Sequence, residues 1–363
     1  MVAAERLAER LAPEHQITLI SRSRRFVFYP AMVRLAFGGC EPEDVSFDLR
    51  EAMLDRRVRF IEGEVARVNP YARSVTLAHG EVTGEMPYDY LVFALGRRLA
   101  TDQVPGFYEH AHHLLTVEAA LKFGEAVRGF RAGHAVIGHC ADARLDIPAY
   151  ETAFALARRL EERRERDQVK ITLVHPHQLV EGLGGRELAH ALRGALEKHR
   201  IELVEDFPIY RVTAREVKAG DRQETMAYDL LMLVPPFAGA GPAVGSDITD
   251  ERGFIRADSR MRVAGIERMY AVGDAVSFRG PKMGHMAVLQ AEVAAANVLA
   301  EIEGREPQDE YQHEMKYVID EGGADSIYLH KELWDDAATE FRQGRFWSWA
   351  KRVHEKYWLR QHA

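Results

Sequence analysis

The sequence predicts an α/β fold built from two similar halves, and three observations support this prediction. Short strand-like runs rich in Val, Ile and Leu alternate with stretches of helical periodicity, as in parallel sheets covered by helices. Each half has a first strand, at 18–21 and at 172–175, and closes with a strand introduced by Tyr-Asp, at 88–94 and at 228–234. Further strand-like runs lie between them. The repeat indicates two Rossmann-like, nucleotide-binding halves, the alternative being two unrelated α/β segments that are alike by chance.

The first residues have the pattern of a helix. Apolar side chains recur at helical spacing over 2–11, and Pro13 ends the pattern before a strand at 16–21. Because a helix in front of a parallel-type strand usually has a strand of its own upstream, we expect the first half to lack its first strand. The second half shows both parts, a strand at 135–138 and the helix after it at 148–166.

Length and composition limit the number of domains and the class of partner. The chain has 363 residues, which at about 100–200 residues per domain suits two domains and a shorter segment. We expect an interleaved first domain at 1–108 and 243–303, a second domain at 109–242, and a C-terminal α+β and amphipathic segment at 304–363. The formal net charge of −8 argues against nucleic acid as a partner. Two cysteines, with neither a signal peptide nor an apolar run of ~18 residues, predict a cytoplasmic protein.

Four stretches of the sequence carry a resemblance to a known family. They are a strand ending in Ala-Leu-Gly at 88–96, a strand ending in Gly-Asp at 266–274, the segment 281–286 with an Ala-rich helix after it, and a strand, loop and Pro-Ala-Tyr-Glu helix start at 137–151. In this order they resemble the pyridine nucleotide-disulfide oxidoreductases, flavoproteins with two dinucleotide-binding domains. Within that superfamily the chain is most similar to the sulfide:quinone oxidoreductase branch, with type II NADH dehydrogenases as neighbours.

The resemblance implies FAD as the cofactor. Gly273 allows the backbone to approach a cofactor closely, and the Asp274 carboxylate can accept a hydrogen bond from a ribityl hydroxyl. Lys282 is a candidate for stabilising negative charge on a reduced flavin, with a solvated turn residue as the alternative. The predicted cofactor-binding residues are Ser21, Arg22, Pro30, Val65, Ala94, Leu95, Gly96, Gly273, Asp274, Lys282 and Met283.

Both halves lack the glycine loop that holds a dinucleotide pyrophosphate. The G-x-G-x-x-G fingerprint is absent from the start of the chain, so we expect weakened or lost FAD binding, and a flavin-free scaffold or partner subunit is one alternative function. In the second half a single glycine, Gly138, stands where such a loop has three, and His175 replaces the acidic residue that binds a ribose. NADH is therefore a disfavoured donor, and an NADH:quinone oxidoreductase is the other alternative.

The redox cysteines of the sulfide:quinone branch are also missing. By resemblance they would fall at Leu145, near Leu115 and near Tyr317. Cys140 and Cys40 lie at none of these positions. Cys140 follows a predicted strand and is a candidate reactive thiol, although a half-buried, small apolar residue is the more ordinary interpretation. Ordinary sulfide oxidation by a cysteine pair is therefore not expected.

One more residue near the predicted flavin is a candidate for catalysis. His285 could relay a proton to a quinone with a pKa near neutral, the alternative being a plain residue at a helix N-terminus. No histidine spacing typical of a metal site occurs, so no metal is predicted. Together with the resemblance, these residues predict an FAD-dependent oxidoreductase that passes electrons from a small reductant to a quinone at a membrane surface.

The C-terminal residues predict a basic helix with an aromatic face. From Arg345 onward, basic residues lie largely on the other faces of the helix. The apolar residues that recur on one face are Phe346, Trp349, Ala350, Val353 and Tyr357. Such a helix suits a membrane interface, so peripheral attachment to a membrane surface is predicted. Packing on the protein's own core or in a homodimer is the alternative.

Overall fold

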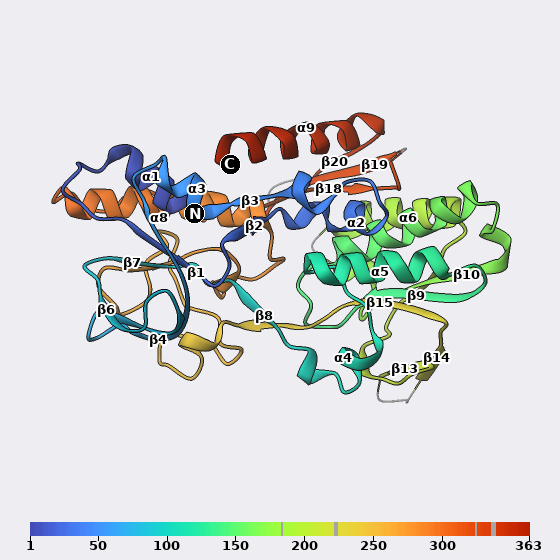
Figure 1. Cartoon of the computed structure of the whole chain (residues 1–363). Helices are drawn as coiled ribbons and strands as arrows, with labels where there is room; N and C mark the ends of the chain where they lie inside the picture. Colours follow the sequence, from blue (N-terminus) through green and yellow to red (C-terminus); the bar gives the residue numbers. More distant parts are fainter. Residues whose placement is uncertain (183, 221–223, 324, 335–338) are drawn as a thin grey trace.

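The computed structural model describes residues 1–363 apart from 183, 221–223, 324 and 335–338. Two α/β lobes lie side by side, and a small sheet with the C-terminal helix forms a further layer above them (Figure 1). Both lobes contain parallel strands that are covered by helices. The predicted fold class, two Rossmann-like domains in tandem, is confirmed.

The first lobe combines the start of the chain with a later segment. β1 pairs in parallel with β4, the sheet continues as an antiparallel meander through β5 and β6, and β7 pairs in parallel with β17. In the described part of the chain no strand pairs with the other edge of β1, in keeping with the expected order of helix before strand. The main elements are α1 (Val2–Arg10), β1 (Thr18–Ser21), β2 (Arg25–Val27), β3 (Ser46–Asp48), α3 (Leu49–Leu54), β4 (Arg59–Asn69), β5 (Ser74–Gly80), β6 (Gly84–Pro87), β7 (Leu91–Phe93), β17 (Met269–Ala271) and α8 (Gly284–Ile302).

Helices α1 and α8 pack against each other on this lobe. Val2 and Leu7 of α1 are buried in one apolar cluster with Ala294 and Val298 of α8. Small residues on α8 allow the two helices to approach closely, and burial of the apolar side chains stabilises the pair. This packing fixes α8 and therefore the segment 281–283 that leads into it.

The second lobe is a parallel sheet in the strand order β11-β10-β9-β15. A small antiparallel sheet of β12, β13 and β14 is attached to it. The helix predicted at 148–166 is α6, which ends at Glu162. The elements are α4 (Phe107–His110), α5 (Val117–Gly129), β9 (Gly133–His139), α6 (Ile147–Glu162), β10 (Val169–Val174), α7 (Gly185–Lys198), β11 (Glu202–Val204), β12 (Ile209–Val212), β13 (Glu216–Ala219), β14 (Glu224–Ala227) and β15 (Leu230–Val234).

Three segments of the chain join the lobes, a short helix and two crossings between the lobes. The short helix α2 (Met32–Ala36), from the first part of the chain, packs into the core around α5 and α6. The two chain crossings, β8 (Arg97–Leu99) and β16 (Phe237–Gly239), pair antiparallel. A Cβ on Gly239 would lie 1.7 Å from the carbonyl oxygen of Gly253, so only glycine permits this close approach of two backbones.

The C-terminal layer is the antiparallel sheet β18 (Glu314–Asp320), β19 (Ser326–Glu332) and β20 (Glu340–Gln343), followed by α9 (Arg345–His362). Helix α9 lies over both lobes (Figure 1). It contacts them through ion pairs and through Trp358, which packs against Phe26 and Phe28. Its ion pairs with the rest of the chain are Glu355 with Arg34, Lys351 with Glu151, and His362 with Glu5.

The aromatic face of α9 points away from the protein. Phe346, Trp349 and Tyr357 are 60%, 55% and 66% exposed. The helix itself does pack on the protein, as the alternative proposed, but through its other side, where Trp358 lies against Phe26 and Phe28. No helix in the described ranges is long and apolar enough to cross a membrane.

Candidate functional site

Several predicted cofactor residues meet at the carboxyl ends of parallel strands. Gly273 and Asp274 come soon after β17, and the segment 94–96 directly follows β7, its neighbour in the sheet. The Val272 N–H donates to the Phe93 carbonyl over 3.0 Å, which holds the two loops side by side. Ligands of open α/β sheets bind in the crevice outside such carboxyl ends. The structure thus brings these residues together at the edge where a ligand is expected.

Gly273 and Asp274 are held in place by side chains from other elements. The Gly273 backbone has a φ of +72°, and its N–H donates to the Gln290 side chain of α8 over 2.7 Å. The Asp274 carboxylate lies 2.9 Å from an Arg97 guanidinium nitrogen, and these side chains are only 20% and 13% exposed. A carboxylate has about four acceptor positions, so Asp274 can accept a further hydrogen bond while it is paired.

The other predicted residues lie on β1, directly after β1, on β4 and, for Pro30, in a short 3-10 helix after β2. Ser21 ends β1, and its hydroxyl accepts a hydrogen bond from the Ser23 N–H over 3.3 Å. Arg22 and Pro30 are exposed. Val65 of β4 packs, half-buried, against the apolar cluster that contains β17. Ser21, Arg22 and Val65 therefore belong to the same lobe as Gly273, and only Val65 shares its apolar cluster with the strand that leads into the glycine. Pro30 instead lies next to Ala31, which is buried in the core of the second lobe.

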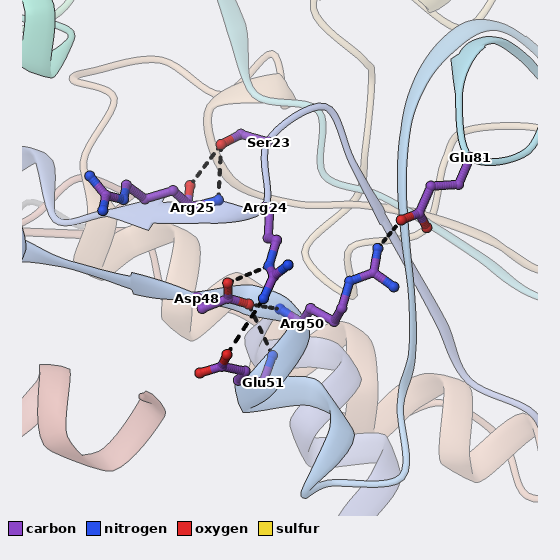
Figure 2. A network of polar contacts seen from close by, with 7 residues as sticks. All are labelled: Ser23, Arg24, Arg25, Asp48, Arg50, Glu51 and Glu81. Carbon is purple, nitrogen blue, oxygen red and sulfur yellow. Dashed lines mark hydrogen bonds and ion pairs between the residues drawn. The ribbon is translucent and has the colours of Figure 1, made fainter.

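Polar contacts around Asp48 fix the segment that follows β1. Figure 2 shows the Asp48 carboxylate accepting from the N–H groups of Arg50 (2.8 Å) and Glu51 (3.1 Å), which caps α3, and pairing with Arg24. Arg50 pairs in turn with Glu81. A hollow of about 310 Å³ lies beside this network. It is lined by Arg24, Arg25, Glu43, Ser46, Phe47 and Asp48.

We expect Asp48→Ala to lower the free energy of unfolding by about 1–3 kcal/mol, because it removes both a helix cap and an ion pair. Urea denaturation measures the change. The matched control is Asp55→Ala at the exposed opposite end of α3, which should change stability by less than about 0.5 kcal/mol. Equal losses in the two variants would contradict the structural role of Asp48.

Lys282 is buried beside the strand-end loops and is 7% exposed. Its ammonium group donates to the Val276 carbonyl and lies 4.6 Å from the centroid of the Phe254 ring. Burial, together with the nearby Arg144 guanidinium, lowers the pKa of Lys282 to about 7. The alternative of a solvated turn residue is therefore wrong.

This burial predicts a pH dependence of stability. The folded protein releases the Lys282 proton near pH 7, whereas an ordinary lysine releases it near 10.5. Between these values the unfolded chain binds more protons, so the contribution of Lys282 to the free energy of unfolding rises with pH, by up to about 1.4 kcal/mol per unit. The free energy of unfolding is measured by denaturation at pH 7.5 and at pH 9.5 for the wild type and for Lys282→Met. From the lower to the higher pH, the wild type should gain stability relative to the variant. A difference that stays constant with pH would contradict the buried ammonium.

Two sequence predictions about chemistry need correction. Cys140 is 1% exposed in an apolar cluster, and burial, with Asp142 nearby, raises the pKa of its thiol to about 12. A thiol in this setting keeps its proton, so Cys140 is not a reactive nucleophile. His285 lies in the first turn of α8, where burial lowers its pKa to about 4 despite the opposing effect of Glu314. The predicted near-neutral pKa is wrong because the ring is largely removed from water.

Apolar side chains occupy the positions where the resembled branch has its redox cysteines. Leu115 and Leu145 come together in one apolar cluster with Phe237 and Phe254. Tyr317 lies elsewhere, in the core of the second lobe. The structure therefore brings two of the three positions together, next to the ring that Lys282 contacts, and it places no thiol there.

Three residues that complete the site were not predicted from the sequence. Arg97 pairs with Asp274, Gln290 binds the Gly273 backbone, and Arg144 donates to the Gly280 carbonyl over 3.0 Å. Arg97 directly follows the predicted residue Gly96, so its place in the sequence could have identified it as a site residue. No pattern in the sequence marks Arg144 or Gln290 in this way. A hollow of about 10 Å³, room for one water, lies beside Gln290. Its lining is Gly273, Asp274, Val276, Phe278, Pro281, Lys282, Met283, Met286, Gln290 and His313.

Comparison with known proteins places the chain in a family. Residues 1–291 match the family described as pyridine nucleotide-disulphide oxidoreductase. The chain belongs to this family. The resemblance found in the sequence is thereby confirmed at the level of the family, and the match spans both lobes.

Individual relatives agree with this assignment. A sulfide-quinone reductase of Aquifex aeolicus is 33% identical over 179 residues, covering 48% of this chain and 41% of the relative. The alternative NAD(P)H-ubiquinone oxidoreductase C1 of Arabidopsis thaliana is 24% identical over 330 residues, covering 80% of this chain and 62% of the relative. The matched regions thus span less than two thirds of either relative. The X-ray structure of sulfide:quinone oxidoreductase from Aquifex aeolicus has the same fold, with a TM-score of 0.91, 23% identity and coverage of 99% of this chain and 88% of that one.

Proposed function

We propose that this protein is an FAD-dependent oxidoreductase that delivers electrons to a quinone. The observation that carries the proposal is the strand-end site, where Gly273 and Asp274 are fixed next to the loop 94–96 at the edge that binds ligands in this class of sheet. Membership of the family supports the redox chemistry. Both curated relatives described above are named for a quinone or ubiquinone, which supports the acceptor.

The residues present fit FAD at this edge. Ala94 and Leu95 are exposed there, so the edge is open to a ligand, and the Asp274 carboxylate can accept a hydroxyl hydrogen bond beside its contact with Arg97. Ser21 and Arg22 at the end of β1 are proposed to contact the adenosine part, with Pro30, Val65, Gly96 and Met283 completing the set. When bound, FAD would accept an electron pair from a donor and release it to the quinone.

Lys282 is proposed to provide positive charge beside the flavin. Its ammonium lies in a low-dielectric setting, where a charge acts strongly on a neighbouring group. Arg144 adds a second, half-buried cation near the same ring of Phe254. These groups favour negative charge at this site.

The donor is proposed to be a small reductant that is not captured by a cysteine. Leu115 and Leu145 fill the places of two family thiols, and Cys140 is buried with its proton in place. NADH remains a disfavoured donor, because His139 and Cys140 follow Gly138 in the second lobe where a dinucleotide loop would need further glycines.

Attachment to a membrane surface through α9 completes the proposal. The exposed aromatic side chains lie on a helix whose ends carry Arg345 and Arg360. Aromatic rings and basic residues in this arrangement suit the headgroup region of a bilayer, from which a quinone would be taken. A homodimer formed through the same face is the competing explanation.

The test of the electron acceptor does not depend on the donor. The FAD-loaded protein is reduced with dithionite under anaerobic conditions and mixed with a short-chain quinone, while the absorbance of the flavin is followed. We expect reoxidation much faster than that of free reduced FAD. Reoxidation no faster than that of free FAD would contradict a quinone acceptor.

A further inference from the structure

Four titratable side chains form a line across the C-terminal sheet. They come from consecutive elements of the chain: His285 from α8, Glu314 from β18, His330 from β19 and Glu340 from β20. The His285 Nε2 lies 3.6 Å from one Glu314 carboxylate oxygen, and the His330 Nε2 lies 2.7 Å from the other. The His330 Nδ1 lies 3.8 Å from the Glu340 carboxylate.

The strand register explains why these groups meet. His330 is paired directly opposite Glu340 on one side and opposite Lys316 on the other. Glu314 lies two residues before Lys316, so its side chain is on the same face of the sheet. Directly opposed and diagonal neighbours on one face are within reach of long side chains. The line is therefore a consequence of the pairing, with α8 packed beside its first strand.

We propose that this line, the His285–Glu340 relay, conducts protons from the protein surface to the quinone site. The inference rests on the proposed function. Reduction of a quinone to a quinol takes two electrons, which the reduced cofactor supplies, and two protons, which form the two O–H bonds. The reduced flavin itself carries one of these protons, and the other comes from water at the surface. A quinone that meets the flavin beside the strand-end hollow therefore needs a path for that proton.

The inner end of the relay lies beside the candidate site. Met283 and Met286, which flank His285 in the chain, line the hollow next to Gly273. Within the described residues, neither ring nitrogen of His285 has a hydrogen-bond partner, although both are buried. A neutral imidazole carries one donor and one acceptor nitrogen, so it can take up a proton at one and release it at the other. The 3.6 Å separation from Glu314 is closed by a small movement or by one bridging water.

The outer end reaches solvent. The Glu340 side chain is 41% exposed and pairs with Arg342 over 2.7 Å. Around Glu314, burial raises the pKa of its carboxyl, but the hydrogen bond with His330 and the charge of Lys316 lower it overall. The carboxylate is therefore ionised at neutral pH and can hold a proton only in passing between the two histidines.

Two more charged or titratable groups lie near the relay, Lys316 and His354 of α9. The Lys316 ammonium is 3.6 Å from the Glu314 carboxylate. His354 adds to the effect of burial in lowering the pKa of His285. The described residues contain no group of three or more metal-ligating side chains arranged to hold an ion. Proton conduction accounts for the alternation of histidine and carboxylate along a line, which an ion pair on a sheet surface does not require.

The relay is tested in the FAD-loaded protein, reduced with dithionite and mixed with a short-chain quinone. We expect His330→Ala and Glu314→Gln to slow reoxidation at least about tenfold at pH 8, with the rate of Glu314→Gln recovering toward pH 5, where protons are more abundant. Added imidazole should restore His330→Ala by replacing the missing proton carrier. The matched control is Glu332→Gln, an exposed charge change opposite Glu314 in the register, which should leave the rate unchanged.

A second readout needs no turnover. The Glu314 carboxylate stabilises the charged form of His285 and so raises its pKa. Glu314→Gln removes this effect, so an NMR titration should show a still lower pKa for His285. A wild type that quinone does not reoxidise would overturn the proposed function and the relay together. A wild type that is reoxidised would overturn the relay alone if His330→Ala is equally fast, or if it is slow and does not respond to imidazole.

Discussion

Replacing Asp274 with alanine should weaken FAD binding about 10- to 100-fold. The carboxylate is held beside Arg97 at the strand-end edge and is only 20% exposed. A hydrogen bond from a cofactor hydroxyl to a charged group contributes about 1.5–3 kcal/mol, which corresponds to this loss of affinity. Titration of the purified protein with FAD, followed by quenching of flavin fluorescence, gives the dissociation constant.

The control for Asp274→Ala is another ion pair on the same segment. Asp102 pairs with Arg98 over 2.6 Å, and both side chains are well exposed. Asp102→Ala removes a carboxylate next to an arginine outside the site, so FAD affinity should not change. Asp274→Asn, which keeps the size of the side chain and one acceptor oxygen, should retain more affinity than Asp274→Ala. Equal affinity in Asp274→Ala and the wild type would remove Asp274 from the cofactor site.

The second large effect is expected at the membrane. Changing Phe346, Trp349 and Tyr357 together to serine should reduce binding to vesicles of anionic phospholipid at least about 100-fold, because each buried aromatic side chain contributes about 1.5–3 kcal/mol. All three are more than half exposed, so the changes remove no contact with the protein's core. Co-sedimentation with vesicles measures the partition.

Tyr108→Ser provides the matched control, since Tyr108 is 84% exposed on the second lobe. It should leave vesicle binding unchanged. Vesicle binding that persists in the triple variant would contradict the membrane role of α9. If the triple variant instead turns a dimer into a monomer in sedimentation experiments without vesicles, the aromatic face is a contact between two copies.

Local patterns predicted much of the fold. The helix over 2–11, the strand at 18–21 and the Gly-Asp after a buried strand are all present as α1, β1 and the loop after β17. In each case neighbouring residues determine the feature, since helical spacing, β-branched runs and a glycine at positive φ are properties of short segments. The absence of a G-x-G-x-x-G fingerprint from both halves was also visible in the sequence, because this motif is local.

Features that depend on distant residues were not predictable. The spacing of Phe346 and Trp349 identified an amphipathic helix, but it could not show that the polar side faces the protein, because this depends on Glu5, Arg34 and Glu151. The burial of Lys282 and the low pKa of His285 likewise follow from packing against elements far away in the chain. Burial of Cys140 reversed its predicted reactivity for the same reason.

Binding of FAD by this chain can be read from the absorption spectrum of the purified protein. The purified protein is incubated with excess FAD, passed over a desalting column and examined for flavin absorbance, with Asp274→Ala treated in parallel. We expect a coloured wild-type protein whose flavin absorbance bleaches on reduction and returns when quinone is added, and a variant that keeps much less flavin. A colourless wild-type protein that takes up no FAD at any concentration tested would contradict the account and favour a flavin-free scaffold.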